Sequence, residues 1–219
     1  MLLRNLDLLL SDPASFFVMI PAILGALVVG ITIHEFSHAL TARSLGDNTA
    51  KNLGRLSLNP LAHLDPLGSL MLLLAGFGWG KPVPVDHRLL RNGRRDMALV
   101  SSAGPISNLA TAFLAALPFN IGLVSLSGTA MSTILGYFIY INVILAVFNL
   151  IPLFPLDGSK IALGILPRGL ASRFARIEMY GPIILILIVG IDFFTRANIL
   201  WRVMGPAVNF FLFLILGLS

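Results

Sequence analysis

Long apolar runs, several of them long enough to cross a lipid bilayer, are the feature that most constrains this chain. Of its 219 residues, 57% are hydrophobic and only 11% are charged. A soluble domain usually carries about 25% charged residues, so this chain has too little charge to cover a surface that faces water. The sequence therefore predicts an integral membrane protein.

Five apolar segments are expected to cross the membrane as helices, because about 20 residues suffice for one crossing. The first of them continues as a helix beyond its apolar part, and Gly46 is suited to end it. We find no linker and no segment large enough to form a separate soluble domain, and we expect one membrane domain over residues 1–219. The fold class is an all-α polytopic bundle, with spans at about residues 16–33, 97–117, 129–151, 180–194 and 199–218.

The region before the second span is less regular. Residues 66–80 are apolar but short and broken by glycine, which favours a re-entrant or interfacial segment. In the following sequence GWGKPVPV (78–85), Pro82 and Pro84 exclude a central strand but permit an edge strand. We expect a small β-hairpin or re-entrant element here. An edge strand would be able to pair with an extended peptide of another protein, and a surface loop without such a contact is the alternative.

The charge pattern predicts an orientation. The net charge of +5 is explained by basic residues in cytoplasmic loops, and we expect no nucleic-acid partner. If loops 43–96 and 154–177 are cytoplasmic, all but three of the 15 Lys and Arg residues lie on that side, the exceptions being Arg4, Arg196 and Arg202. Five spans then place the N-terminus outside.

A histidine pair at helical spacing indicates a metal site. The chain has no cysteine, so a metal has to be held by His, Asp or Glu. His34 and His38 of HEFSH lie on one face of a helix, about 5–6 Å apart, where both rings can reach one zinc ion. Glu35 lies where it can take a proton from a metal-bound water. A chance match, or two buried histidines bonded to backbone, is the alternative, but ionisable residues within a span are costly and functional by default.

Two histidines leave zinc short of a third protein ligand, and Asp157 is the candidate. It follows the third span, on the side of the membrane where the first span also ends. Pro152 and Pro155 break the helix before it, and irregular backbone at membrane depth is tolerated only inside protein or beside a water-filled cavity. Alone, Asp157-Gly158 would be interpreted as a turn.

These motifs together resemble the site-2 protease family of intramembrane zinc metalloproteases. The resemblance rests on HEFSH, on NLIPLFPLDG (149–158), on SAGPISN (102–108) and on GWGKPVPV, and it covers about residues 16–160. It implies a three-span catalytic core, with the spans at about 178–219 as accessory. It also implies the site residues: the zinc ligands His34, His38 and Asp157, the general base Glu35, and Asn149 and Asn108 as groups that support the site or bind substrate.

The resemblance implies proteolysis of another membrane protein within or near its transmembrane segment, with one zinc ion as cofactor. The expected location is a prokaryotic cell membrane, with the active site toward the cytoplasmic face. A metal-ion transporter or a non-proteolytic metal-binding membrane protein is the alternative, and Glu35 distinguishes them, because a transporter has no specific need for it. The substrate, the oligomeric state and the roles of His63 and His87 stay open.

Overall fold

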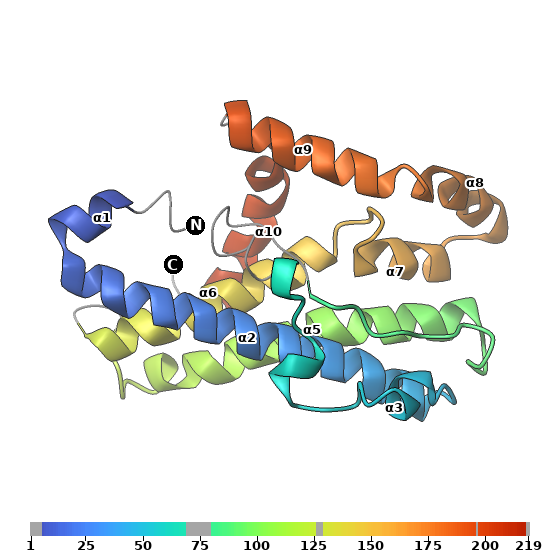
Figure 1. Cartoon of the computed structure of the whole chain (residues 1–219), viewed down its shortest axis with the longest axis horizontal. Helices are drawn as coiled ribbons and strands as arrows, with labels where there is room; N and C mark the ends of the chain where they lie inside the picture. The colour runs from blue at the N-terminus through green and yellow to red at the C-terminus, as the bar shows by residue number, and fades with distance from the viewer. Residues whose placement is uncertain (1–5, 69–79, 126–128, 196, 218–219) are drawn as a thin grey trace.

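The computed structural model describes residues 6–68, 80–125, 129–195 and 197–217, and over these residues the chain is helical, without a strand (Figure 1). One isolated β-bridge joins Leu64 to Gly80. The predicted all-α class is confirmed. The elements are α1 (Leu6–Ser11), α2 (Pro13–Ser44), α3 (Thr49–Asn52), the 3₁₀ turn η2 (Pro60–Ala62), α5 (Arg94–Asn120), α6 (Ala130–Asn149), α7 (Asp157–Ile165), α8 (Arg168–Glu178), α9 (Gly181–Thr195) and α10 (Ile199–Leu216).

Helix α2 has clear start and stop signals. The side chain of Asp12 accepts a hydrogen bond from the backbone N–H of Ser15, and Pro13 occupies the first turn, where a missing N–H costs nothing. The helix ends at Ser44, and Gly46 follows with φ +112°, a conformation that favours glycine. The stop predicted at Gly46 is confirmed, and the helix is continuous from the apolar span through HEFSH.

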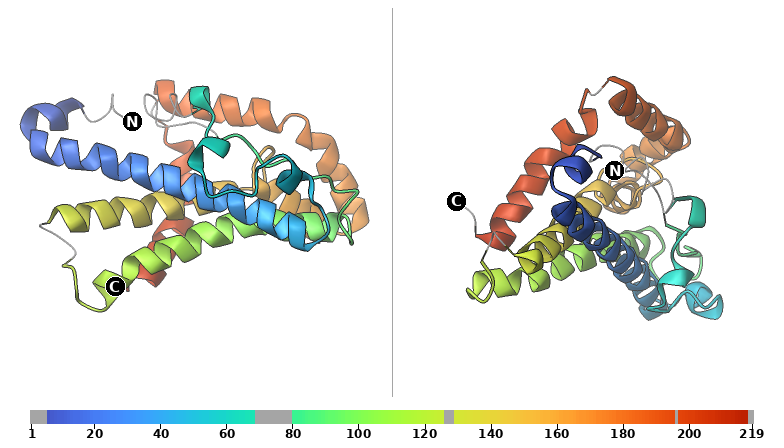
Figure 2. Two further views of the ribbon diagram at one scale, coloured as in Figure 1. Left: turned by 60° about the horizontal axis from the view of Figure 1, so that its bottom comes forward. Right: turned by 60° about the vertical axis from the view of Figure 1, so that its left-hand side comes forward.

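Helices α2, α5 and α6 form the centre of the molecule, each packed against the other two. In Figures 1 and 2, α2 and α6 run in the same direction and α5 runs in the opposite one. Alanines at the contacts, among them Ala26 of α2, Ala112 of α5 and Ala146 of α6, are fully buried and allow the backbones to approach closely. The ends of α2 and α6 therefore lie at the same end of the bundle as the start of α5.

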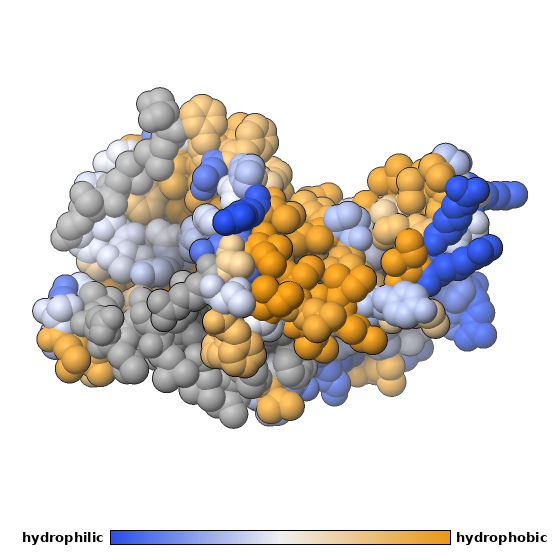
Figure 3. Space-filling view, turned by 90° about the horizontal axis from the view of Figure 1, so that it is seen from above, coloured by the Kyte–Doolittle hydropathy of each residue, from blue (hydrophilic) through white to orange (hydrophobic). Residues whose placement is uncertain are grey.

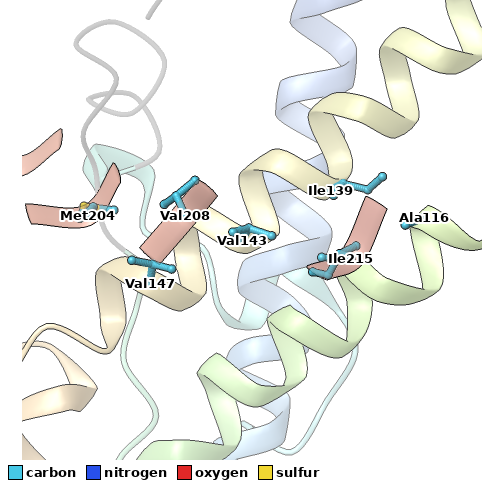
Figure 4. Packing of buried hydrophobic residues seen from close by; sticks show 8 residues of the cluster. Ala116, Ile139, Val143, Val147, Met204, Val208 and Ile215 are labelled. Atoms are coloured by element: carbon cyan, nitrogen blue, oxygen red, sulfur yellow. The ribbon is translucent and has the colours of Figure 1, made fainter. Parts of the chain in front are cut away.

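Helix α10 completes a hydrophobic core with α5 and α6. Val143 of α6 and Val208 of α10 are fully buried there, and Val147 and Met204 pack beside them (Figure 4). Ala116 contributes from α5. This core is separate from the cluster that joins α2 to α6 around Ile23, so helix α10 is fixed to the centre by apolar packing.

The number of spans is close to that predicted. By length and composition, α2, α5, α6 and α10 are each able to cross a bilayer. Helix α9, in the predicted fourth span, qualifies only together with α8, from which it is bent by 59°. Apolar residues of α9 such as Ile183, Ile186 and Leu187 are exposed. Figure 3 shows an apolar area on one face of the molecule, with a group of hydrophilic side chains at one end and others near the middle. The chain is an integral membrane protein.

The small β element predicted before the second span is not supported. Residues 80–85 form no strand, and the bridge at Gly80 is their one ladder contact; residues 69–79 lie outside the described part. The backbone N–H groups of residues 82–84 explain why no strand forms here. Pro82 and Pro84 have no N–H, and the N–H of Val83 donates to the Glu35 carboxylate. Residues 82–84 therefore have no N–H left for a ladder.

Candidate metal centre

His34, His38 and Asp157 converge inside the bundle. The two imidazole rings lie edge to face, with their centroids 4.6 Å apart. The Oδ2 atom of Asp157 lies 3.0 Å from Nε2 of His34 and 3.1 Å from Nε2 of His38. All three side chains are buried, and one potential ligand atom from each lies within 4.8 Å of the others. The spacing of HEFSH and the break after α6 thus bring together the three residues that the sequence singled out.

The other ring nitrogens determine what these atoms can do. Nδ1 of His38 lies 2.7 Å from the carbonyl oxygen of Val100, and Nδ1 of His34 lies 2.6 Å from Oδ1 of Asn108. Oxygen atoms of these types only accept, so each Nδ1 carries a hydrogen, and in the neutral ring that binds a metal each Nε2 presents a lone pair. The two lone pairs then face the Asp157 carboxylate, which is also an acceptor. Three acceptors this close are stable only around a positive charge, and a zinc ion fits this donor set.

Gly104 of α5 leaves space at the ring nitrogens. A Cβ atom at this position would lie 2.5 Å from Nε2 of His34 and 2.5 Å from Nε2 of His38, far below any normal contact. The sequence alone would allow Gly104-Pro105 to be interpreted as a packing kink. The structure places the glycine where any larger residue would enter the space that a metal ion needs.

The turn after α6 determines where Asp157 lies. Helix α6 ends at Asn149, and α7 begins at Asp157 itself, so Pro152 and Pro155 lie in the irregular segment between the helices, as predicted. A Cβ atom on Gly158 would lie 2.3 Å from the carbonyl oxygen of Leu150. Only glycine therefore lets the start of α7 pack against the end of α6, and this contact turns Asp157 toward the histidines.

Glu35 is held by a loop. Its Oε2 atom accepts a hydrogen bond of 3.0 Å from the backbone N–H of Val83. Among the described residues, no hydrogen bond to its other oxygen, Oε1, is present. The side chain is half-buried, next in sequence to the buried His34, so one carboxylate oxygen is anchored and the other is available.

The loop that carries Val83 is itself anchored on both sides. The N–H of Lys81 donates to the carbonyl oxygen of His63 at 2.7 Å, and Arg55 donates to the carbonyl oxygen of Lys81. Beyond Val83, the N–H of Asp86 donates to Oδ2 of Asp47 at 2.8 Å. These contacts fix the loop segment 80–86 to residues 47–63, which follow α2.

The other residues considered in the sequence differ in whether they contact the metal group. Asn108 contacts His34 directly, as described above. The amide of Asn149 instead donates to the carbonyl oxygen of Leu145 in its own helix, and no described contact joins it to the metal group. His63 is fully buried, with Nε2 2.7 Å from the carbonyl oxygen of Ser57, and His87 is exposed. Neither belongs to the described metal group.

The sequence did not predict the residues that contact the site residues from outside the metal group. The backbone groups of Val100 and Val83 have no side-chain signal. Asn142 contacts Asn108 and offered one weak signal, because it is a lone amide in the middle of an apolar span, where polar side chains bond across helices.

Comparison with known proteins identifies the family of this chain. The sequence profile described as peptidase family M50, the site-2 protease family, matches residues 118–189. YwhC of Bacillus subtilis (strain 168), which bears the name of a zinc metalloprotease, is 38% identical over 176 residues, covering 78% of this chain and 80% of that protein. The chain belongs to peptidase family M50.

Two mycobacterial relatives are less similar to the chain. Rip2 of Mycobacterium tuberculosis (strain H37Rv) is 33% identical over 151 residues, which cover 66% of this chain and 56% of that protein. Rip2 of Mycolicibacterium smegmatis is 29% identical over 157 residues, which cover 67% of this chain and 58% of that protein. Both also bear the name of a zinc metalloprotease. No solved structure matches the chain. As an M50 member, the chain is a zinc metalloprotease with zinc as its cofactor.

Proposed function

We propose that this protease hydrolyses a peptide bond within or next to a transmembrane segment of another membrane protein. We assign His34, His38 and Asp157 as the zinc ligands and Glu35 as the general base. The observation that carries the assignment is the convergence of three acceptor atoms, with both Nδ1 hydrogens directed away from them. The helices that carry the two histidines and precede Asp157 are each apolar enough to cross a bilayer, which supports a substrate that is itself in the membrane.

The chain's own residues have separate roles in this reaction. Zinc supplies a Lewis acid that polarises a carbonyl oxygen and makes a water molecule more acidic. Glu35 takes a proton from the attacking water at Oε1, because the Val83 N–H occupies Oε2. It then delivers this proton to the departing amide nitrogen. The Val83 hydrogen bond fixes the direction of the carboxylate. Apolar helices around the site limit the entry of bulk water.

The orientation is also part of the proposal. Residues 81–95, α7 and α8 carry nine of the 15 Lys and Arg residues, and α7 and α8 lie at the end of the bundle where α2 ends and α5 begins (Figure 1). By the positive-inside rule, this end faces the cytoplasm of a prokaryotic cell and the N-terminus lies outside. Residues 16–160 then form the catalytic core and residues 178–219 are accessory, because the site residues all lie within the former range.

The alternative of metal transport has no specific observation in its favour. A transporter needs ligands that release the metal, whereas the buried ligand atoms here have their second nitrogens fixed by Val100 and Asn108. Such second partners strengthen metal binding. Membership of peptidase family M50 also favours hydrolysis.

The test is cleavage in a defined membrane. The purified protein is placed in lipid vesicles with a model substrate that has a single transmembrane helix, and its zinc content is measured in the same samples. We expect cleavage that stops when a chelator removes zinc and returns when zinc is added. A water-soluble peptide of the same cleaved sequence is the matched control, and we expect slower cleavage of it. Equal cleavage of both substrates would contradict the membrane-substrate proposal, and zinc-independent cleavage would contradict the metal assignment.

A further inference from the structure

Asn142 is a fully buried amide in the middle of α6 that the metal ligands and Glu35 do not explain. Its Nδ2 donates to the carbonyl oxygen of Phe138 at 2.8 Å, one turn earlier in the same helix. Because that carbonyl only accepts, the orientation of the Asn142 amide is fixed. Its Oδ1 atom therefore points away from its own helix backbone and accepts from Nδ2 of Asn108 on α5 at 2.9 Å.

Asn108 links the amide of Asn142 to His34, a proposed metal ligand. Its Nδ2 has two hydrogens, which are donated to Oδ1 of Asn142 at 2.9 Å and to the carbonyl oxygen of Gly30 at 3.0 Å. The remaining end of the amide, Oδ1, faces Nδ1 of His34 at 2.6 Å. The amide is thereby prevented from turning over, and only an acceptor meets the ring of His34.

Gly30 makes room for this chain of amides. A Cβ atom there would lie 2.8 Å from Cδ1 of Leu145 and 2.9 Å from Oδ1 of Asn142. The glycine lets α2, α5 and α6 meet closely enough for the two amides to bond. Gly30, Asn108 and Asn142 are all buried, so no bulk water replaces a lost partner.

We propose that Asn142 is a positioning residue for the metal centre, which acts through Asn108 to keep the hydrogen of His34 on Nδ1 and the lone pair of Nε2 toward zinc. The inference rests on the proposed ligand role of His34. Without Oδ1 of Asn142, the Asn108 amide loses one of the two acceptors that fix it. When it turns over, it offers an N–H to Nδ1, which favours a hydrogen on Nε2, where it blocks metal binding.

The first test measures zinc affinity by competition with a chelator in the detergent-purified full chain. Loss of outer partners of metal ligands typically weakens metal binding about 10–100-fold, and we expect a loss in this range for Asn142→Leu. Asn120→Leu is the matched control, because it removes the same kind of amide, which there bonds to the carbonyl oxygen of Ile215 at the far end of α5. The control should bind zinc as tightly as the unmodified protein.

A double substitution separates positioning from general damage to the fold. In Asn108→Asp, the carboxylate presents only acceptors to His34, whatever occupies position 142, as in the carboxylate–histidine–zinc arrangement. Adding Asn142→Leu should then weaken zinc binding by no more than about twofold, the range within which independent changes add. Gly30→Ala, which displaces Oδ1 of Asn142 but keeps every amide, should show the same dependence on Asn108→Asp.

The tautomer itself is observable. The chain has four histidines, so ¹⁵N-histidine labelling of the zinc-loaded protein gives a spectrum simple enough to assign by single substitutions. We expect His34 with its hydrogen on Nδ1 in the unmodified protein and a shift toward Nε2 in Asn142→Leu. An unchanged tautomer would overturn the inference.

The outcomes for the inference and for the proposed function are distinguishable. Zinc binding that is unaffected by His34→Ala would refute the ligand assignment and with it the proposed function. Zinc binding that depends on His34 but is unchanged in Asn142→Leu would refute the inference alone. The inference also fails if Asn142→Leu weakens zinc binding by the same factor with and without Asn108→Asp, since that pattern indicates a purely structural role.

Discussion

At the scale of single residues, the site depends on glycines at three positions as well as on the side chains that form it. Gly104, Gly158 and Gly30 each occupy a position where a Cβ atom would lie within 3 Å of an atom of the site or of the turn that forms it. The proposed zinc ligands are therefore supported by close backbone approach as well as by hydrogen bonds.

Gly104→Ala should abolish stoichiometric zinc binding, because the added methyl group would overlap both Nε2 atoms. Gly25→Ala is the matched control on α2, since its Cβ would meet nothing within 4 Å, and alanine is the better helix former by about 1 kcal/mol. Metal analysis of the two purified variants checks the prediction. Full zinc content in Gly104→Ala would show that the metal is bound elsewhere.

At the scale of elements, the loop segment 80–86 and the helix that carries Glu35 act as one unit. Pro82 and Pro84 leave Val83 with the sole N–H of residues 82–84, and that N–H is directed at Oε2 of Glu35. The loop thus orients the proposed base, and its two prolines restrict the backbone on either side of the one donor.

Val83→Pro removes this N–H, and we expect it to lower the rate of substrate cleavage while zinc content stays the same. A hydrogen bond to a charged group contributes about 1.5–3 kcal/mol, so the rate should fall roughly 10–100-fold if the full contribution is lost. Val83→Ala keeps the N–H and is the matched control, with cleavage near that of the unmodified protein. Equal cleavage rates in the two variants would show that the Val83 N–H does not support catalysis by Glu35.

Much of the site was predictable because its signals are local. The spacing of His34 and His38 predicts a shared helix face, and prolines before Asp157 predict the break that turns it inward. The β element was predicted wrongly because composition at 80–85 does not reveal that Val83 donates to a side chain 48 residues away. Asn142 was missed for the same reason, since its partner lies on another helix. Hydropathy did not predict the bend between α8 and α9, because it indicates the length of an apolar segment and not the direction of its helix.

At the scale of the whole molecule, the proposed orientation directs the end of the bundle where α2 ends toward the cytoplasm. The absence of native cysteine permits single-cysteine labelling in intact cells. Asn92→Cys and Ser172→Cys should react only with reagent that reaches the cytoplasm, because both positions lie among basic residues. Gly122→Cys, in the uncharged turn after α5, should react from the outside. Labelling of Asn92→Cys from the outside would reverse the orientation and place the active site on the other face.

The central claim is that three residues hold zinc while Glu35 moves a proton, and one paired measurement of zinc content and cleavage tests it. Glu35→Gln keeps all three ligands, so it should retain near-stoichiometric zinc while cleavage of a transmembrane substrate falls by about 10²–10⁴-fold, the usual contribution of general acid–base catalysis. Asp157→Ala should lose zinc itself, because it removes one of three protein ligands. Cleavage by Glu35→Gln at the unmodified rate, or unweakened zinc binding by Asp157→Ala, would contradict the account.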